Sequence, residues 1–454
     1  MRRAFEFSAA ALRGKRGTVP WMLALVSGLV LMQLLFVGVL TAVHAIPDAR
    51  IVGQLASDLD AGLWVGSDEA VDPVTRGGRS DAYTDCIVIT AGLGDDGINP
   101  LRSALTLPHL GSCQPAAAGI SALLAGETPP VEATYARYWG GFAVFTRPLL
   151  AFGGLGALRI FAATAAIAAV AGLFFVLRRR TSVWVPLALV APLALTTNLL
   201  GQVGYGVIHV LEFAVMVACA IGGVLAARHG MFLVGAVSVF AGGVFVFVDF
   251  LHNPPLAWAL FAFSAAASFV AQRRSESHPV RQAIVAVVVA SVGWIAGYAL
   301  TWASRWGIGI LSGAATFDEI AGKVALWTDG SGEEAVAAGL GGGIRKNAHF
   351  WLTFVPFAWL VLAACLLLVA IVIVVAVRRK AFPALGVAGV LAAVAVIPLV
   401  WLEVLPAHSQ HHYFFVYRAI PGAVAVLAAA AAMFFVSERP RLTPARDARG
   451  SAGG

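Results

Sequence analysis

Two carboxylates stand four residues apart in the segment SDAYTDC, residues 80–86. If this segment is helical, Asp81 and Asp85 lie on one face, because side chains four residues apart are neighbours on a helix. Two such acids can share a divalent ion, hold a cationic partner, or divide into a general base and a group that positions it. Ordinary acids on an exposed loop are the alternative. Asp58 and Asp60 form a second pair in SDLDAG, for which helix-end capping is the simpler interpretation.

A second segment that could bind a ligand is YARYWGGFAVFTRPLL, residues 135–150. Arg137, Tyr138 and Trp139 precede an apolar stretch that ends in Arg147 and a proline. We expect an interfacial helix here, whose arginines bind an anionic lipid head group. The alternative is an aromatic belt with a snorkelling arginine, which is common at membrane surfaces.

Histidines mark a third segment, PAHSQHHYFFVYR, residues 406–418. His408 and His411 are three residues apart and could bind a metal ion from one helical face. No cysteine is near and the carboxylates are distant in sequence, which favours an anion site instead. His411 and Arg418 are seven residues apart, which predicts one helical face for both, and with the amides of the following helix they could hold a phosphate. Interfacial histidines without a ligand are the alternative.

The elements that must position these residues are predicted to be membrane helices. The chain has 454 residues, of which 59% are hydrophobic and 12% charged, whereas soluble domains carry about 25% charged residues. We expect an all-α polytopic protein. Approximately ten stretches are long enough to cross a bilayer, over residues 20–44, 152–177, 183–200, 205–227, 231–250, 256–272, 283–303, 351–377, 382–404 and 415–436.

Basic residues predict the orientation of these helices. The net charge of +7 is not a sign of nucleic-acid binding, because well over half of the 31 basic residues fall in one alternate set of short connections. The positive-inside rule makes that side cytoplasmic. Residues 1–19 and a disordered tail at 437–454 are then expected in the cytoplasm. The membrane that the chain spans is expected to be a bacterial plasma membrane. The large loop at 45–151 and the loop at 304–350 face outward.

The cysteines and the polar residues agree with this sidedness. Cys86 and Cys113 both lie in the first outward loop, where an oxidising compartment permits a disulfide. The bridge would stabilise the chain by about 3 kcal/mol in a chain-entropy picture, and two free thiols are the alternative. Polar residues gather near the outward face, which predicts one site that opens outward. A pump or channel would carry ionisable groups through the full membrane thickness.

The three segments together resemble a family of bacterial polytopic membrane proteins. That family keeps the elements D-x-x-T-D, R-Y-W-x-G-(Y/F)…R-P-L-L and H-S-x-x-H…(Y/F)-R in this order. The layout is also similar to that of GT-C glycosyltransferases, in which an acid of the first extracytoplasmic loop acts near the acceptor and the donor is a sugar on a polyprenyl phosphate. This chain departs from their commonest pattern, since its acid pair lies some forty residues past the first span.

The resemblance implies a role for each segment. Asp81 or Asp85 would be the catalytic base, and Tyr138, Trp139 and Arg147 would line the substrate groove. The residues expected at the donor phosphate are His408, His411, Arg418, Arg137 and Arg305. The acceptor would be an envelope glycan, a lipid or a protein, and a divalent metal stays an open cofactor. A transporter of lipid-linked glycans and a non-enzymatic envelope assembly protein are the rival interpretations.

Overall fold

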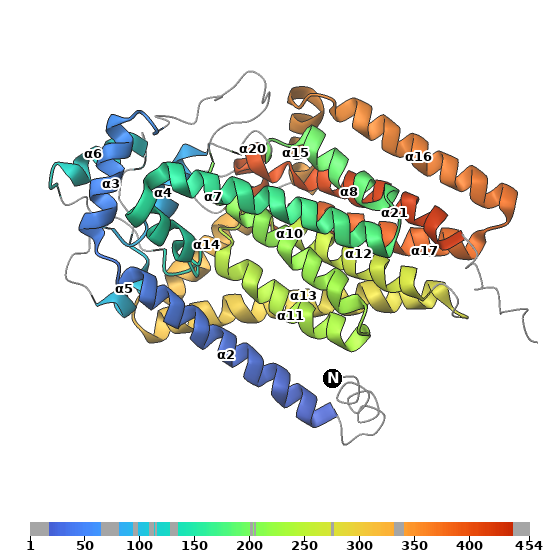
Figure 1. The fold of residues 1–454 in the computed structure, drawn as a ribbon, viewed down its shortest axis with the longest axis horizontal. Coiled ribbons are helices and arrows are strands. Elements are labelled where there is room, and N and C mark those ends of the chain that lie inside the picture. Colours follow the sequence, from blue (N-terminus) through green and yellow to red (C-terminus); the bar gives the residue numbers. More distant parts are fainter. Residues whose placement is uncertain are drawn as a thin grey trace, which may run out of the picture.

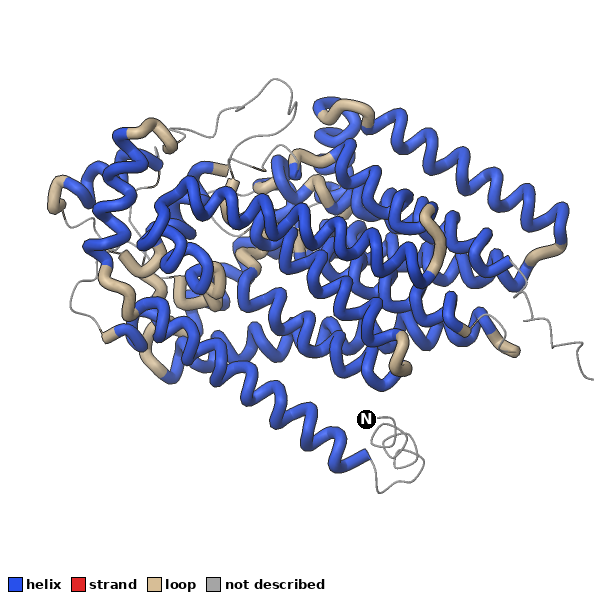
Figure 2. The backbone as a smooth tube through the Cα atoms, viewed as in Figure 1, coloured by secondary structure: helices blue, strands red, loops and turns tan. Residues whose placement is uncertain are grey.

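The computed structural model describes residues 18–64, 81–93, 99–108, 113, 116–127, 135–199, 203, 206–273, 277–330 and 340–438. Within these ranges the chain forms helices and no strand (Figure 2). Nine of the helices described are long and apolar enough to cross a membrane. The chain is therefore an all-helical multi-pass membrane protein, as its composition predicts. Most of the predicted cytoplasmic N-terminus and of the predicted disordered tail lies outside the described residues.

The candidate spans form one bundle along the long axis of the molecule (Figure 1). Their bounds are α2 Thr18–His44, α7 Ala143–Arg180, α10 Ile208–Ala227, α11 Met231–Val248, α12 Pro254–Gln272, α13 Pro279–Leu311, α16 Ala358–Arg379, the continuous run of α17 Phe382–Ala392, η2 Ala393–Ala395 and α18 Val396–Val404, and the run of α20 Tyr413–Val416 with α21 Ala419–Glu438. The spans α12 and the α20–α21 run are almost wholly buried, whereas α2 and α16 expose most of their residues. Exposed leucines such as Leu31 and Leu367 suit contact with lipid.

The tenth predicted span, over residues 183–200, is a shorter helix. It is α8, Trp184–Thr196, with 13 residues. At 1.5 Å per residue it is about 20 Å long, well short of a hydrocarbon core of about 30 Å. Helix α8 still brings the chain back to the end of the bundle where α10 begins. Successive helices therefore run in opposite directions, as they would with ten full spans (Figure 1).

Helix α7 begins at Ala143, well before the span predicted from residue 152, and bends at Gly154, where φ is 68°. Asp58 Oδ2 accepts a hydrogen bond of 2.7 Å from the backbone N–H of Leu155, just past the bend. A Cβ atom at Gly154 would lie 2.7 Å from the Asp58 carboxylate oxygens, so the bend needs a glycine. Asp58 therefore caps the second part of α7, and Asp60, the last residue of α3, is exposed.

The short helices between α2 and α7 gather at one end of the bundle, which we call the Asp81 end (Figure 1). They are α3 Asp48–Asp60, α4 Ala82–Thr90, α5 Pro100–Thr106 and α6 Ala116–Leu124. Further along the chain come α14 Phe317–Asp329, α15 Gly342–Phe354 and α19 Pro406–His411.

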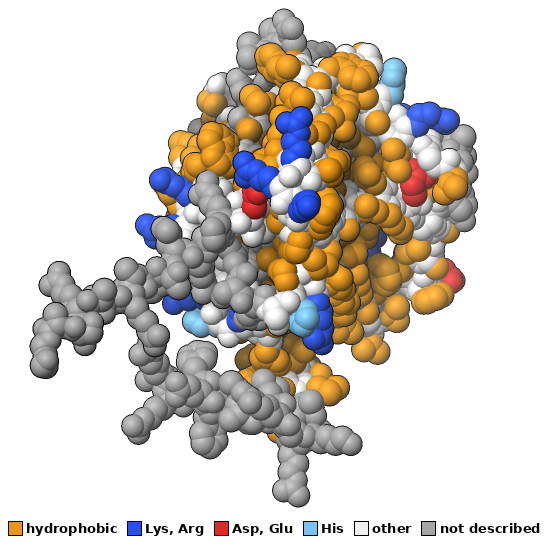
Figure 3. All heavy atoms as spheres, turned by 90° about the vertical axis from the view of Figure 1, so that its right-hand side faces the viewer, with side chains coloured by type: hydrophobic (Ala, Val, Ile, Leu, Met, Phe, Trp, Pro, Cys, Tyr) orange, Lys and Arg blue, Asp and Glu red, His pale blue; other side chains and the backbone are white. Residues whose placement is uncertain are grey.

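The opposite end of the bundle is basic. The last turns of α7 and α16 carry Arg178–Arg180 and Arg378–Arg379. A view onto this end shows several Lys and Arg side chains with few acidic ones (Figure 3). Basic residues therefore concentrate at the end that lies away from Asp81, as the sequence pattern requires.

Candidate functional site

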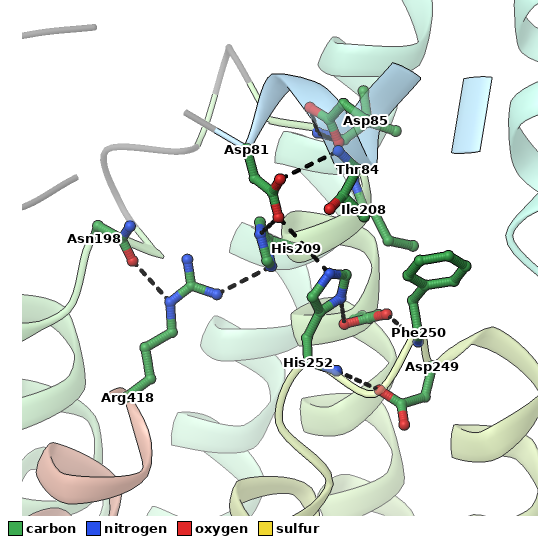
Figure 4. A network of polar contacts seen from close by, with 12 residues as sticks. Asp81, Thr84, Asp85, Asn198, Ile208, His209, Asp249, Phe250, His252 and Arg418 are labelled. Atoms are coloured by element: carbon green, nitrogen blue, oxygen red, sulfur yellow. Dashed lines mark hydrogen bonds and ion pairs between the residues drawn. The ribbon is translucent and has the colours of Figure 1, made fainter. Parts of the chain in front are cut away.

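Asp81 lies at the start of α4 and is fully surrounded by protein. It is the N-cap residue of that helix, and its Oδ1 atom accepts a hydrogen bond of 3.1 Å from the backbone N–H of Thr84. Its Oδ2 atom lies 3.0 Å from Nε2 of His209 and 4.0 Å from Nε2 of His252 (Figure 4). The cap fixes one carboxylate oxygen, so the other is presented to the two imidazoles.

Asp85 has different partners from Asp81. It lies in the first turn of α4, and its carboxylate oxygens accept hydrogen bonds of 3.0 and 3.1 Å from the backbone N–H groups of Val207 and Ile208, at the start of α10 (Figure 4). Loss of hydration raises the pKa of the partly buried Asp85 carboxyl to about 7; the Ile208 and Val207 hydrogen bonds oppose the rise and the charge of Asp81 adds to it. Asp85 therefore holds the N-terminus of α10 in place.

His209, Glu212 and His252 complete the surroundings of Asp81. The sequence places His252 among the polar residues near the predicted outward face, but it does not single out His209 or Glu212. Nδ1 of His252 lies 2.6 Å from Oε2 of Glu212, and the other oxygen of Glu212 accepts a hydrogen bond of 2.7 Å from the N–H of Phe250. His209 and Glu212 are three residues apart on α10 and share a face. Burial lowers the pKa of His252 to about 3; the Asp81 charge opposes this change and the Arg418 charge adds to it. His252 is therefore neutral.

Arg418 approaches from the start of α21 and is buried. Its Nε atom donates to Oδ1 of Asn198 at 2.7 Å, and its Nη1 atom lies 3.1 Å from Nδ1 of His209. An arginine can only donate, so His209 accepts at Nδ1 and carries its proton on Nε2, toward Asp81. The Nη2 atom of Arg418 has no hydrogen-bond partner among the described residues. We call Asp81, His209, Glu212, His252 and Arg418 the polar cluster.

The predicted pairing of His411 with Arg418 on one helical face is not found. Helix α19 ends at His411, α20 begins at Tyr413, and His412 between them has non-helical geometry. This break turns the chain, so that Arg418 meets His209 on α10 instead.

The histidines of residues 408–412 form an aromatic neighbourhood next to the polar cluster. The ring centroid of Trp327 on α14 lies 5.2, 6.1 and 5.1 Å from those of His408, His411 and His412. Burial lowers the pKa of His408 to about 3, and the neighbouring imidazoles of His252 and His411 lower it further. His408 is therefore uncharged, and its Nδ1 atom has no hydrogen-bond partner among the described residues.

Phe415 joins the two groups of histidines. Its ring centroid lies 5.2 Å from that of His209, 4.9 Å from that of His252 and 5.2 Å from that of His412. The polar cluster is therefore walled on this side by an aromatic ring.

Two of the predicted ligand-binding arginines are engaged with the backbone. Arg147 donates to the carbonyl oxygens of Val43, Ile46 and Ala91 and forms a 2.6 Å ion pair with Asp48. It therefore ties the end of α2 to α3 and α4. Arg305 on α13 donates to the carbonyl oxygens of Tyr138 and Leu105 at 2.6 and 2.8 Å.

Tyr138 and Trp139 are buried rather than open to solvent. The Trp139 indole donates to the carbonyl oxygen of Thr301 at 2.9 Å. Tyr138 stacks on Phe250 with centroids 4.5 Å apart, and the Arg137 guanidinium lies 5.1 Å from the Tyr138 ring centroid. The Tyr138 ring thus packs on the loop that carries His252.

Cys86 and Cys113 form the disulfide that the sequence predicts, with Cα atoms 5.8 Å apart. Cys86 follows Asp85 directly on α4, and both half-cystines are buried. The bridge therefore restrains the helix that presents Asp81 to the polar cluster.

The chain matches no protein-family model, no curated protein and no solved structure.

Proposed function

We propose that this chain is a membrane glycosyltransferase, which moves a sugar from a polyprenyl-phosphate donor to an acceptor hydroxyl at the Asp81 end. The observation that carries the proposal is the buried guanidinium of Arg418 beside the Asp81–His209 pair. Its Nη2 atom lacks a hydrogen-bond partner among the described residues, and a buried donor without a partner is costly. A phosphate oxygen would satisfy it, since the arginine fork matches phosphate geometry.

An apolar groove supports a lipid-linked donor. It has a volume of about 680 Å³ and lies between α8, α16 and α21. Leu195 lines one end of it, three residues before the Asn198 side chain that accepts from Arg418. Arg379 and Glu438, which form a 3.1 Å ion pair, line the other end. A prenyl tail in this groove would leave its phosphate near Arg418.

Asp81 is the best candidate for the base within the predicted pair. Its Oδ2 atom faces a gap of 4.0 Å to Nε2 of His252, where an acceptor hydroxyl can be held by both groups. The N–H at Nε2 of His209 points at the same oxygen and holds it in place. As the bond to the donor phosphate breaks, the Arg418 charge stabilises the leaving group. Asp85 anchors α10 in this scheme and takes no proton.

The basic end of the bundle supports an outward-facing site. The positive-inside rule assigns Arg178–Arg180 and Arg378–Arg379 to the cytoplasm. The polar cluster at the Asp81 end then faces the compartment in which polyprenyl-phosphate sugars act as donors for envelope glycans.

The test is release of polyprenyl phosphate by the purified protein. Short-chain polyprenyl phosphates that carry a pentose or a hexose are incubated with envelope extract as acceptor. We expect release by the wild type and a loss of about 100-fold in Asp81→Asn, the usual size of a general-base contribution. Asp60→Asn, at an exposed acid, is the matched control. A folded wild type that releases nothing from any donor contradicts the proposal.

The same groove also suits a transporter of lipid-linked glycans, because such a protein must bind the same tail and phosphate. A transporter moves the lipid between leaflets and returns it unchanged. Flipping of a labelled lipid in vesicles without cleavage of its sugar–phosphate bond would therefore favour this second function.

A further inference from the structure

We propose that Asp81, His209 and His252 bind one divalent transition-metal ion through Oδ2, Nε2 and Nε2. One potential ligand atom from each residue lies within 4.8 Å of the other two, and all three side chains are buried. Two of these separations are 3.0 and 4.0 Å, both from Oδ2 of Asp81. Metal–ligand bonds of about 2.0–2.2 Å can span these separations with a small contraction. The three residues come from α4, α10 and the loop before α12, so only the fold brings them together (Figure 4).

The neighbours of these atoms prepare them for a metal. Oε2 of Glu212 lies 2.6 Å from Nδ1 of His252, which holds a proton on Nδ1 and leaves the Nε2 lone pair facing the gap. A carboxylate behind a histidine is the usual second partner of a metal-bound imidazole. The Thr84 N–H holds the other oxygen of Asp81. With the ion bound, Oδ2 of Asp81 would be a ligand rather than the free base. Three protein ligands leave a fourth position, which would hold the acceptor hydroxyl or a water molecule, as in catalytic zinc sites.

Charge balance also favours a cation. The carboxyl groups of Asp81, Glu212 and Asp249 are all buried, and Arg418 is the buried arginine of the polar cluster. Oδ2 of Asp249 has no hydrogen-bond partner among the described residues. A buried carboxylate that is ionised needs a compensating charge, and one divalent ion would supply two positive charges. Two imidazoles and one carboxylate suit Zn²⁺ better than Mg²⁺ or Ca²⁺, which prefer oxygen ligands.

Metal binding would also change the role of Arg418. The Arg418–His209 contact places the His209 proton on Nε2, and a metal must replace it there. The proton then moves to Nδ1, which no longer accepts from Arg418, so Nη1 becomes free together with Nη2. The ion and an anion at Arg418 should therefore bind cooperatively. Only the identity of that anion as a donor phosphate rests on the proposed function.

The test is metal binding by the full-length protein in detergent. Protein treated with a chelator and then freed of it is titrated with Zn²⁺ by calorimetry, and metal content after dialysis is measured by mass spectrometry. We expect about one ion per chain and a loss of at least roughly 10-fold in affinity for Asp81→Asn and His252→Ala, since losing even a group that only hydrogen-bonds to a metal ligand costs about 10- to 100-fold. His349→Ala, at an exposed histidine, is the matched control. Thermal unfolding establishes that each variant is folded.

A third variant separates two locations for the metal. If His411→Ala abolishes binding and His252→Ala does not, the ion belongs to the histidines near Trp327 and the proposal is overturned. It is also overturned if wild-type protein binds Zn²⁺ more weakly than about 1 mM. Inorganic phosphate should bind more tightly to the zinc-loaded protein than to the metal-free protein, and not to Arg418→Ala.

The two proposals can fail separately. If the protein binds zinc but cleaves no donor, the transferase proposal is contradicted and the metal-site proposal stands. Full-rate cleavage by a protein that binds no Zn²⁺ in the titration would remove the metal site and keep the transferase.

Discussion

The guanidinium of Arg418 lies 3.1 Å from Nδ1 of His209, and this contact joins the start of α21 to the first turn of α10. It sets the tautomer of His209, because arginine can only donate. The proton on Nε2 of His209 then points to Asp81. Three residues that are more than 120 positions apart in the sequence thus form one hydrogen-bonded chain.

Arg418→Lys should weaken use of the lipid-linked donor, and Arg418→Ala should weaken it further. Lysine cannot reach Asn198 and His209 together and also present a two-pronged contact to phosphate. A charge-assisted contact contributes about 1.5–3 kcal/mol, so the alanine variant should lose roughly 10- to 150-fold at 1.4 kcal/mol per decade. Donor binding at matched folded yield measures this, with Arg345→Lys, at an exposed position of α15, as control. If the lysine variant binds the donor as tightly as the wild type, the charge of Arg418 serves only to set the membrane topology.

Asp85 should make stability depend on pH. Its folded-state pKa is raised to about 7, mainly by loss of hydration. Because the folded state holds the proton more tightly than the unfolded state, the stabilisation is complete below pH 4 and is lost as the pH rises through about 7. From pH 5 to pH 8 the wild type should lose on the order of 2–3 kcal/mol relative to Asp85→Asn. Chemical unfolding of both proteins at several pH values measures the difference, and parallel pH profiles would contradict it.

Arg147→Ala should unfold the Asp81 end. The substitution removes hydrogen bonds to three carbonyl groups and leaves Asp48 without its 2.6 Å partner. Breaking a buried pair costs about 3–5 kcal/mol. The matched control is Arg379→Ala, because the exposed Arg379–Glu438 pair should contribute less than about 1 kcal/mol. Melting temperatures in detergent compare the two, and equal small losses would refute the structural role of Arg147.

The Cys86–Cys113 bridge should be present in protein from an oxidising compartment. An unreduced digest should contain the linked peptides, and thiol labelling should reach Cys219 and Cys365 alone after unfolding. Cys113→Ser should lower stability by about 3 kcal/mol in the chain-entropy picture. Free thiols at both positions would remove the bridge. Cys365→Ser is the control for loss of a buried sulfur.

Reporter fusions after Leu63 and after Arg273 should report opposite sides of the membrane. The first position follows α3 at the Asp81 end, and the second follows α12 at the basic end. The positive-inside rule makes the second position cytoplasmic. The same signal at both positions would contradict the topology.

Composition alone predicts the helical bundle, because long apolar stretches can be satisfied in a bilayer only as helices. The spacing of polar residues also selects Asp81, together with Asp85, and Arg418 as candidates for the site, and the predicted sidedness pairs Cys86 with Cys113. The sequence does not reveal the break at His412, since a helical period cannot show where a short polar segment turns. The expected face shared by His411 and Arg418 fails for that reason.

His209 and Glu212 were missed because they begin an otherwise apolar span. A signal was present: ionisable residues inside a membrane helix are costly and mark functional positions by default, and these two are three residues apart. Their partners Asp81 and His252 are far away in sequence. Without the fold, no spacing rule brings them together.

Helix α8 has a consequence for the surrounding bilayer. With 13 residues it is about 10 Å shorter than the hydrocarbon core, and it borders the groove that leads toward Asn198. Lipid beside it must thin, or the polar ends of α8 must dip into the hydrocarbon. Where the bilayer is thinner, the distance between a lipid head group and Arg418 would be smaller. The rate of the protein should then depend on the acyl-chain length of its host membrane, with thicker bilayers slowing it.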